Sequence, residues 1–154
     1  MTEIEMKPDS NNVNQTTNIK SRMWVAAGCM LAAIGVAFGA IGAHLLEKWV
    51  TENFADPERR LELWGTASRY LMYHALGLLA VGLASFDSNF RRDLVGTVML
   101  LGVILFSGSL YGYVLTDVKP LVHIVPLGGL SMIAAWLMFG WFAFTGQTEK
   151  DVAS

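Results

Sequence analysis

The sequence predicts an all-α protein, an integral membrane four-helix bundle of up-down topology. Four long apolar stretches fill most of the 154-residue chain, at about residues 24–46, 70–83, 94–115 and 121–144. A helix of about 20 apolar residues spans the ~30 Å hydrocarbon core of a bilayer. The stretches lack the residue-by-residue alternation of barrel strands. Because the second and third links are short, the helices that they join are expected to be antiparallel neighbours.

The chain is expected to have a folded membrane domain between two polar tails. Residues 1–23 hold few large apolar side chains, too few to order the segment by burial, and predict a disordered N-terminal tail. Residues 145–154 form a short polar C-terminal tail. The transmembrane domain, residues 24–144, is expected to cross the bilayer at about residues 24–46, 65–84, 94–115 and 121–144.

The first connection contains the start signal of a helix. In Asp56-Pro57-Glu58 the aspartate suits the cap position, proline fits the first turn, and glutamate complements the helix dipole. We therefore expect one helix to run from Pro57 into the second span. The aromatic rings of Trp49, Trp64 and Tyr70 are expected at the level of the lipid headgroups.

Composition excludes several classes of function. A net charge of −2 gives no basic field for nucleic acid. Cys29 is the only cysteine, so an intrachain disulfide or a cysteine metal cluster is impossible. The sequence has no nucleophile elbow, phosphate-binding glycine loop or zinc spacing, and its spans contain no Asp, Glu or Lys. We therefore predict no enzymatic activity, no metal and no cofactor, and the missing carboxylates argue against an ion-coupled carrier.

Small residues are predicted to pack the helices. Residues 28, 32, 35, 39 and 42 of the first span are glycine or alanine at spacings of three and four, which forms a continuous stripe on one helix face. The expected packing glycines are Gly28, Gly35, Gly39, Gly42, Gly108, Gly112, Gly128 and Gly129. Two interpretations remain open: the stripes pack helices within one protomer, or one stripe mates with a partner membrane protein or a second copy.

Polar side chains of the spans are expected to gather in one half of the bundle. The candidate cluster consists of His44, Arg69, Tyr70, His74, Ser107, Ser109, Tyr111 and His123. Tyr70 and His74 lie one turn apart on one helix face, so they can share a hydrogen-bond network. Intramembrane ionisable groups suggest function, and three interpretations stay open here: structural bonds between helices, a polar ligand or proton site, and metal or haem ligation.

The positive charges favour a cytoplasmic location for both termini. The side with the termini carries six cations and the opposite side carries five. Lys20 and Arg22 adjoin the first span, and Arg91 and Arg92 lie in a very short loop, where the positive-inside bias acts most strongly.

Four ordered motifs resemble a known family. They are the segments Gly39-Ala40-Ile41-Gly42-Ala43-His44, Thr66-Ala67 with Tyr70 and His74-Ala75-Leu76, Phe106-Ser107-Gly108-Ser109-Leu110-Tyr111, and Pro126-Leu127-Gly128-Gly129. This pattern is similar to the YgdD-like family of small four-span proteins of bacterial inner membranes, over about residues 24–144. The resemblance implies a four-helix inner-membrane protein and no established activity.

The sequence therefore predicts a non-enzymatic, structural or accessory multi-pass protein of the inner membrane. The alternative is a small-molecule or proton transporter or binder that uses the polar cluster. The expected partners are the lipid bilayer and, through the glycine stripes, a membrane protein or a second copy.

Overall fold

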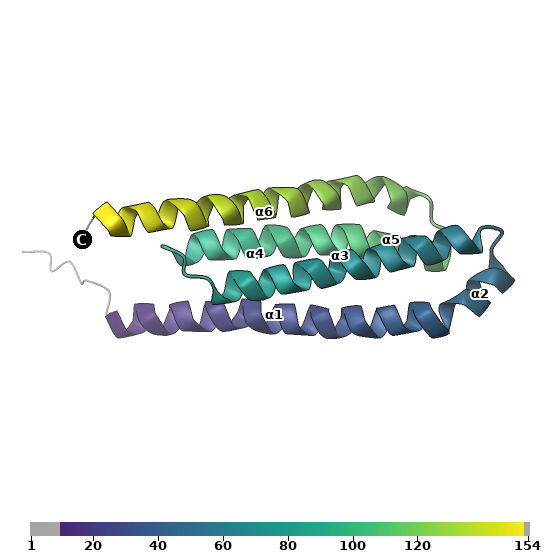
Figure 1. Ribbon diagram of the computed structural model, residues 1–154, viewed down its shortest axis with the longest axis horizontal. Coiled ribbons are helices and arrows are strands. Elements are labelled where there is room, and N and C mark those ends of the chain that lie inside the picture. Colours follow the sequence, from purple (N-terminus) through teal and green to yellow (C-terminus); the bar gives the residue numbers. More distant parts are fainter. Residues whose placement is uncertain (1–9, 153–154) are drawn as a thin grey trace, which may run out of the picture.

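The structure, a computed structural model, describes residues 10–152, with side chains described for residues 19–145. Its elements are α1 (Ser10–His44), α2 (Leu46–Asn53), α3 (Pro57–Leu83), α4 (Asn89–Val103), a π-helix η1 (Ile104–Gly108), α5 (Ser109–Thr116) and α6 (Pro120–Val152). Because α4, η1 and α5 follow one another without a break, they form one rod. The described residues thus form four long rods that lie side by side (Figure 1).

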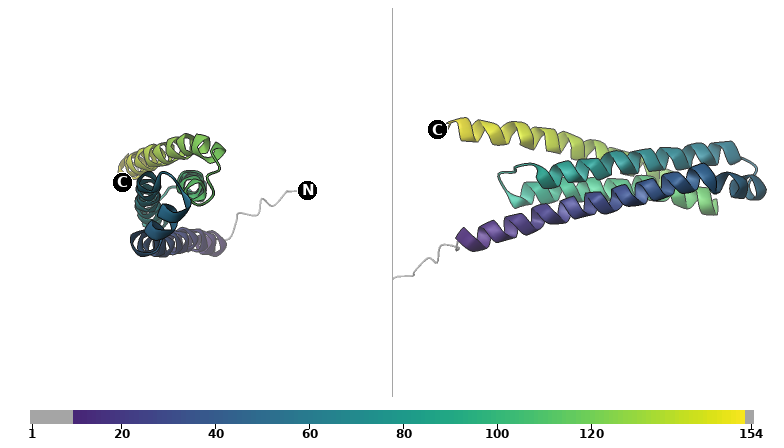
Figure 2. Two further views of the ribbon diagram at one scale, coloured as in Figure 1. Left: turned by 90° about the vertical axis from the view of Figure 1, so that its right-hand side faces the viewer. Right: turned by 60° about the horizontal axis from the view of Figure 1, so that its bottom comes forward.

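Successive rods run in opposite directions. The short helix α2 and the α5–α6 link lie at one end of the molecule, and the α3–α4 link lies at the other end with the outer ends of α1 and α6 (Figure 1). Seen along the rods, α1 and α6 lie on opposite sides of the molecule (Figure 2). The fold is all-α, as the apolar stretches predict.

Three helices of the described chain are long and apolar enough to cross a membrane. They are Ile19–His44, Asn89–Thr116 and Pro120–Thr145, and they identify a helical membrane protein. The expected span at residues 65–84 coincides with α3 up to its last residue, Leu83, and is not among these three. Charged residues in the first turns of α3, together with Arg69, make this helix more polar than the other three rods.

Both terminal helices extend beyond the expected spans. Helix α1 begins at Ser10, so the part of the expected tail at residues 10–23 is helical, while residues 1–9 lie outside the described chain. Helix α6 continues to Val152 through most of the expected C-terminal tail. Once a helix is nucleated, each added residue gains a hydrogen bond. Polar composition alone therefore did not predict where these helices end.

The start of α3 follows the sequence signal, with one correction. Asp56 occupies the cap position and Pro57 the first turn, but the Asp56 carboxylate makes no capping bond. It instead accepts a hydrogen bond from Arg60 Nε at 2.8 Å. Trp64 also differs from its expected place at the headgroups: its ring is buried, and Nε1 donates to the carbonyl oxygen of Phe38 on α1 at 2.7 Å.

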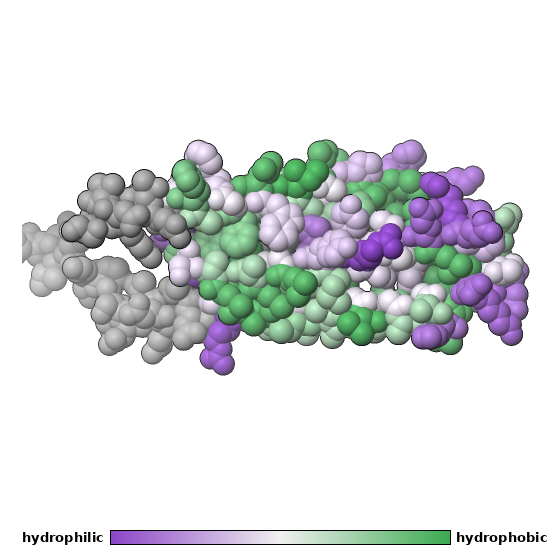
Figure 3. Space-filling view, in the orientation of Figure 1, coloured by the Kyte–Doolittle hydropathy of each residue, from purple (hydrophilic) through white to green (hydrophobic). Residues whose placement is uncertain are grey.

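The buried side chains form two apolar clusters along the bundle. One, near α2, includes Val50, Trp64 and Val114, and the other includes Leu78, Val95 and Met99. On the face shown in Figure 3, hydrophobic residues are spread along the rods with paler and a few hydrophilic residues among them, and hydrophilic residues gather at the α2 end. An apolar outer surface between polar ends is the distribution that a lipid bilayer requires.

Candidate functional site

The eight residues of the predicted polar cluster do not form one group. His44, Arg69 and His123 have exposed side chains on three different rods. The Arg69 guanidinium bonds locally, from Nη2 to Thr66 Oγ1 at 3.0 Å. Chain direction fixes how far along a rod a residue lies, but the rotation of each helix decides whether its side chain points inward, and the sequence did not define this rotation.

The members of the cluster that do point inward connect α3 to the third rod, which consists of α4, η1 and α5. Ser107 Oγ donates to the main-chain carbonyl of Ala67 at 2.9 Å, and the Ser68 and Tyr111 hydroxyls lie 2.9 Å apart. Ser109 is also buried. These bonds satisfy polar groups that would otherwise be costly inside the bundle.

His74 is the buried histidine of the cluster, with only 5% of its surface exposed. Its Nδ1 lies 2.7 Å from the carbonyl oxygen of Tyr70, one turn earlier on α3. Because a carbonyl can only accept, Nδ1 must carry the proton. The ring is therefore held in one orientation, and the hydrogen bond with Tyr70 uses its main chain rather than its hydroxyl.

An aromatic pocket lies beside His74, between α3, η1 and α6. It has a volume of about 390 Å³, and its lining includes Tyr70, Tyr73, His74, Phe106, Gly129 and Trp136. The Tyr70 and Phe106 rings are 4.8 Å apart, and the His74 and Trp136 rings are 6.1 Å apart. The volume falls within the range of small-molecule pockets.

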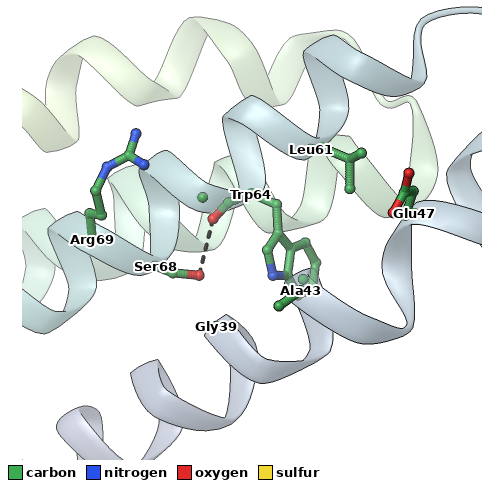
Figure 4. Close-up of a pocket in the computed structure, with 9 residues that line it drawn as sticks. Gly39, Ala43, Glu47, Leu61, Trp64, Ser68 and Arg69 are labelled. Atoms are coloured by element: carbon green, nitrogen blue, oxygen red, sulfur yellow. Dashed lines mark hydrogen bonds between the residues drawn. The ribbon is translucent and has the colours of Figure 1, made fainter.

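A second pocket, of about 460 Å³, lies between α1 and α3 on another face of α3 (Figure 4). Gly39 and Ala43 border it on α1, while Trp64 and Arg69 border it on α3. In Figure 4 the side chains of Arg69 and Glu47 lie at opposite ends, with Trp64 between them. Ser68 Oγ in this pocket donates to the carbonyl of Trp64 at 3.0 Å.

The predicted packing glycines divide into two groups. A Cβ added at Gly28 would lie 2.7 Å from the Ala75 carbonyl, and one at Gly42 would lie 2.6 Å from the Trp64 ring. Added Cβ atoms would also meet close neighbours at Gly35, Gly112 and Gly128. By contrast, a Cβ at Gly39 or Gly108 would meet nothing within 4 Å, and one at Gly129 would make only ordinary contact with Phe106. Most of the stripe on α1 therefore packs against α3, and Gly39 borders open space.

Charged residues that the sequence analysis did not select connect the elements at the α2 end. Arg60 is buried, donates to the carbonyls of Tyr113 at 3.1 Å and Val114 at 3.0 Å, and pairs with Asp56 and Asp117. Burial opposes its charge, but the two carboxylates outweigh burial and raise the pKa of Arg60 above its ordinary value. The spacing of Asp56 and Arg60 signals a local pair. Nothing in the sequence placed Asp117 beside them.

The opposite end has its own charged contact. Lys20 Nζ on α1 lies 2.5 Å from Asp93 Oδ2 on α4, and Trp24 Nε1 donates to Asp93 Oδ1 at 3.0 Å. A Cβ added at Gly96 would lie 2.6 Å from the Trp24 ring, so glycine allows the ring to lie flat against α4. Within the described residues, no group of three or more His, Cys, Asp or Glu residues is placed to hold a metal ion.

Comparisons with known proteins find relatives over most of the chain. The family described as "Protein of unknown function (DUF423)" matches residues 38–129. A UPF0382 membrane protein of Staphylococcus saprophyticus is 37% identical over 117 residues, which are 76% of this chain and 92% of the relative. The UPF0382 membrane protein YwdK of Bacillus subtilis is 39% identical over 119 residues, 76% of this chain and 92% of the relative. No solved structure matches the chain.

Proposed function

Because the chain belongs to the DUF423 family of membrane proteins, also named UPF0382, whose function is unknown, we propose its role from its own geometry. It serves as a structural or accessory protein of the bacterial inner membrane and acts through packing rather than catalysis. Four rods cross the bilayer, with both termini in the cytoplasm. The motifs that resemble the YgdD-like family lie in this shared region.

The separation of charge from the bundle interior carries this proposal. The buried arginines lie near opposite ends of the bundle, Arg60 at the α2 end and Arg92 at the end with the α3–α4 link. Lys20 and Asp93 also lie at the end with the α3–α4 link. Between the ends, the described buried side chains are apolar apart from His74, Ser107, Ser109 and Tyr111. A path for protons or ions requires polar groups throughout the membrane.

Several of the buried polar groups also have structural partners, which favours the structural role over the transporter alternative. Ser107 and Tyr111 bond to α3, and Trp64 bonds to α1. Such bonds between helices contribute about 0.6 kcal/mol each on average in membranes. They supply specificity of packing in a medium where apolar side chains gain little by leaving lipid.

The lipid bilayer is the partner for which the exposed apolar surface is suited. Only 11% of the apolar segment of α1 and 17% of that of α6 is buried, so both outer rods present broad faces to their surroundings. Since Gly28, Gly35 and Gly42 already contact α3, a protein partner or second copy of the chain that binds α1 would have to pack on its outward face, where Ala33, Ala37 and Ala40 are exposed.

A proton-flux measurement tests the proposed role against the transporter alternative. The purified protein is reconstituted into vesicles that contain a pH-sensitive dye, and a potassium diffusion potential is imposed with valinomycin. We expect acidification no faster than in protein-free vesicles, because the interior lacks a continuous polar path. Faster acidification that His74→Gln abolishes would overturn the structural proposal and support transport.

A further inference from the structure

The aromatic pocket beside His74 has the features of a ligand site, which goes beyond a structural role. The pocket has a volume of about 390 Å³, and the buried His74 forms part of its wall. Nδ1 of His74 bonds to Tyr70, whereas Nε2 has no hydrogen-bonding partner among the described residues. The other polar residues of the cluster that bond across the bundle, Ser107 and Tyr111, meet partners on α3. His74 is thus a buried polar side chain with unused bonding capacity at a cavity wall.

The hydrogen bond of His74 defines what the free nitrogen can do. Nδ1 donates to the Tyr70 carbonyl, so in the neutral ring Nε2 carries a lone pair and acts as an acceptor. An apolar environment disfavours a charged ring that lacks a counter-ion. The pocket therefore offers one hydrogen-bond acceptor, and its preferred ligand carries a matching donor.

The remaining lining selects for a flat aromatic molecule. Tyr70, Tyr73, Phe106 and Trp136 contribute aromatic rings to the walls. Offset-stacked and edge-on contacts between aromatic rings are favourable beyond the area that they bury. Gly129 keeps the α6 wall open, since a Cβ there would lie 3.9 Å from the Phe106 ring and any longer side chain would extend further into the pocket.

The π-helix places one of these rings. Phe106 lies within η1, where an added residue per turn widens the helix, and such turns occur frequently at functional sites. Next to it, the main chains of α6 and the third rod approach closely, because Gly102 and Gly128 have no side chains. This approach brings α6 and η1 together as two walls of the pocket.

The mouth of the pocket faces the surroundings of the bundle rather than an aqueous end. Tyr73 is 56% exposed and Ile133 is 58% exposed, and Ile133 lies within the candidate membrane span Pro120–Thr145. A ligand that enters here comes from the lipid phase and must itself be lipophilic.

We propose that this pocket binds a lipophilic aromatic molecule with a ring hydroxyl, of the phenol or hydroquinone class. The ring lies among the aromatic side chains, and its hydroxyl donates a hydrogen bond to Nε2 of His74. This chemistry is shared by small free phenols and by membrane hydroquinones that carry an isoprenoid tail.

The test follows the side-chain nitrogens of the three histidines by NMR. The full chain, labelled with ¹⁵N-histidine, is placed in lipid nanodiscs and titrated with 1-naphthol or with 1-methoxynaphthalene, which has the same rings but no hydroxyl proton. We expect 1-naphthol to move the Nε2 signal of His74 alone, with the exposed His44 and His123 as internal controls. The methyl ether should bind roughly five- to tenfold more weakly, the factor that one hydrogen bond supplies.

Two variants of α6 test whether the response depends on the pocket. Gly129→Leu fills the cavity beside Phe106 and should abolish the shift, whereas Gly140→Leu, at a position with nothing within 4 Å, should preserve it. An unmoved His74 signal, equal responses to naphthol and its ether, or a shift retained in Gly129→Leu would each overturn the proposal. A long-tailed hydroquinone in the nanodisc that also moves the signal identifies a membrane lipid as the source. A response to naphthol alone supports the class and identifies a small phenol.

Discussion

At the scale of single residues, Arg60 shows how a buried cation becomes a structural contact. Its guanidinium reaches the carbonyls of Tyr113 and Val114 at the end of α5, as well as Asp56 and Asp117 on either side. The last carbonyls of a helix have no partner within the helix, so a positively charged donor there is favourable. Asp117 adopts a left-handed conformation with φ of 58°, which Asp tolerates better than most residues. Arg60 therefore joins the start of α3 to the end of the third rod.

Replacing Arg60 with methionine should destabilise the bundle. The methionine side chain would leave the two carbonyls without these donors and both carboxylates without their cation, and we expect a loss of about 2–3 kcal/mol. Arg60→Lys should recover only part of it, because an ammonium lacks the planar fork that reaches several acceptors at once. Thermal aggregation in detergent measures the effect, with the exposed neighbour in Arg59→Met as the control. Equal melting temperatures for Arg60→Met and Arg59→Met would contradict the role of Arg60.

At the scale of helices, glycine decides which rods can approach closely. Gly28 lies where α1 passes over the main chain of α3, near Ala75 and Leu79, and Gly102 faces Gly128 where the third rod passes α6. Membrane helices associate largely through such close contacts, because apolar side chains are equally well solvated by lipid. The stripe on α1 was recognisable from its spacing of three and four. Gly39 is the member of this stripe that makes no close contact with α3, because α1 borders the pocket between α1 and α3 at that point.

Alanine substitutions at Gly28 and Gly39 should therefore have different effects. A Cβ at Gly28 would meet main-chain atoms of α3 at 2.7–2.9 Å, which cannot move aside as a flexible side chain can. We expect Gly28→Ala to lose about 1–3 kcal/mol, the usual range for overpacking. Gly39→Ala should be neutral or slightly stabilising, since alanine favours helix more than glycine does. Unfolding in mixed micelles with increasing sodium dodecyl sulfate provides the comparison, and equal stability of the two variants would remove Gly28 from the α1–α3 contact.

The sequence predicted the helices better than it predicted their contacts. Long apolar runs and the Asp-Pro-Glu signal located the rods, because hydropathy and capping are local properties. The π-helix at Ile104–Gly108 was not predicted, since its extra residue per turn has no signal in hydropathy. Trp64 was assigned to the headgroups by its residue type, but its ring packs against those of Phe38 and Tyr111, with centroids 5.5 Å and 4.6 Å away. Helix rotation and long-range partners such as Asp117 depend on the assembled bundle.

At the scale of the whole molecule, α3 decides how many times the chain crosses the membrane. Hydropathy identifies the other three rods as candidate spans. Yet α3 runs alongside them for most of its length (Figure 1), and its buried residues extend from Arg60 to Gly82. Contacts with neighbouring helices bury His74, while the exposed Arg69 guanidinium bonds locally to Thr66 Oγ1, so α3 can cross beside more apolar neighbours.

The number of crossings determines whether the two termini lie on the same side of the membrane. Four spans place both termini on one side, whereas three spans without α3 place them on opposite sides. Reporters active only in the cytoplasm or only outside it are fused before Met1 and after Ser154, with a third fusion in the α2–α3 link after Asn53. We expect cytoplasmic signals from both terminal fusions and an external signal from the fusion after Asn53, because Arg91 and Arg92 lie on the side of the termini. The structure places these two arginines in the first turn of α4, directly after the short link, rather than in the link itself. Termini on opposite sides would exclude α3 as a span, and two external termini would keep four spans but reverse their orientation.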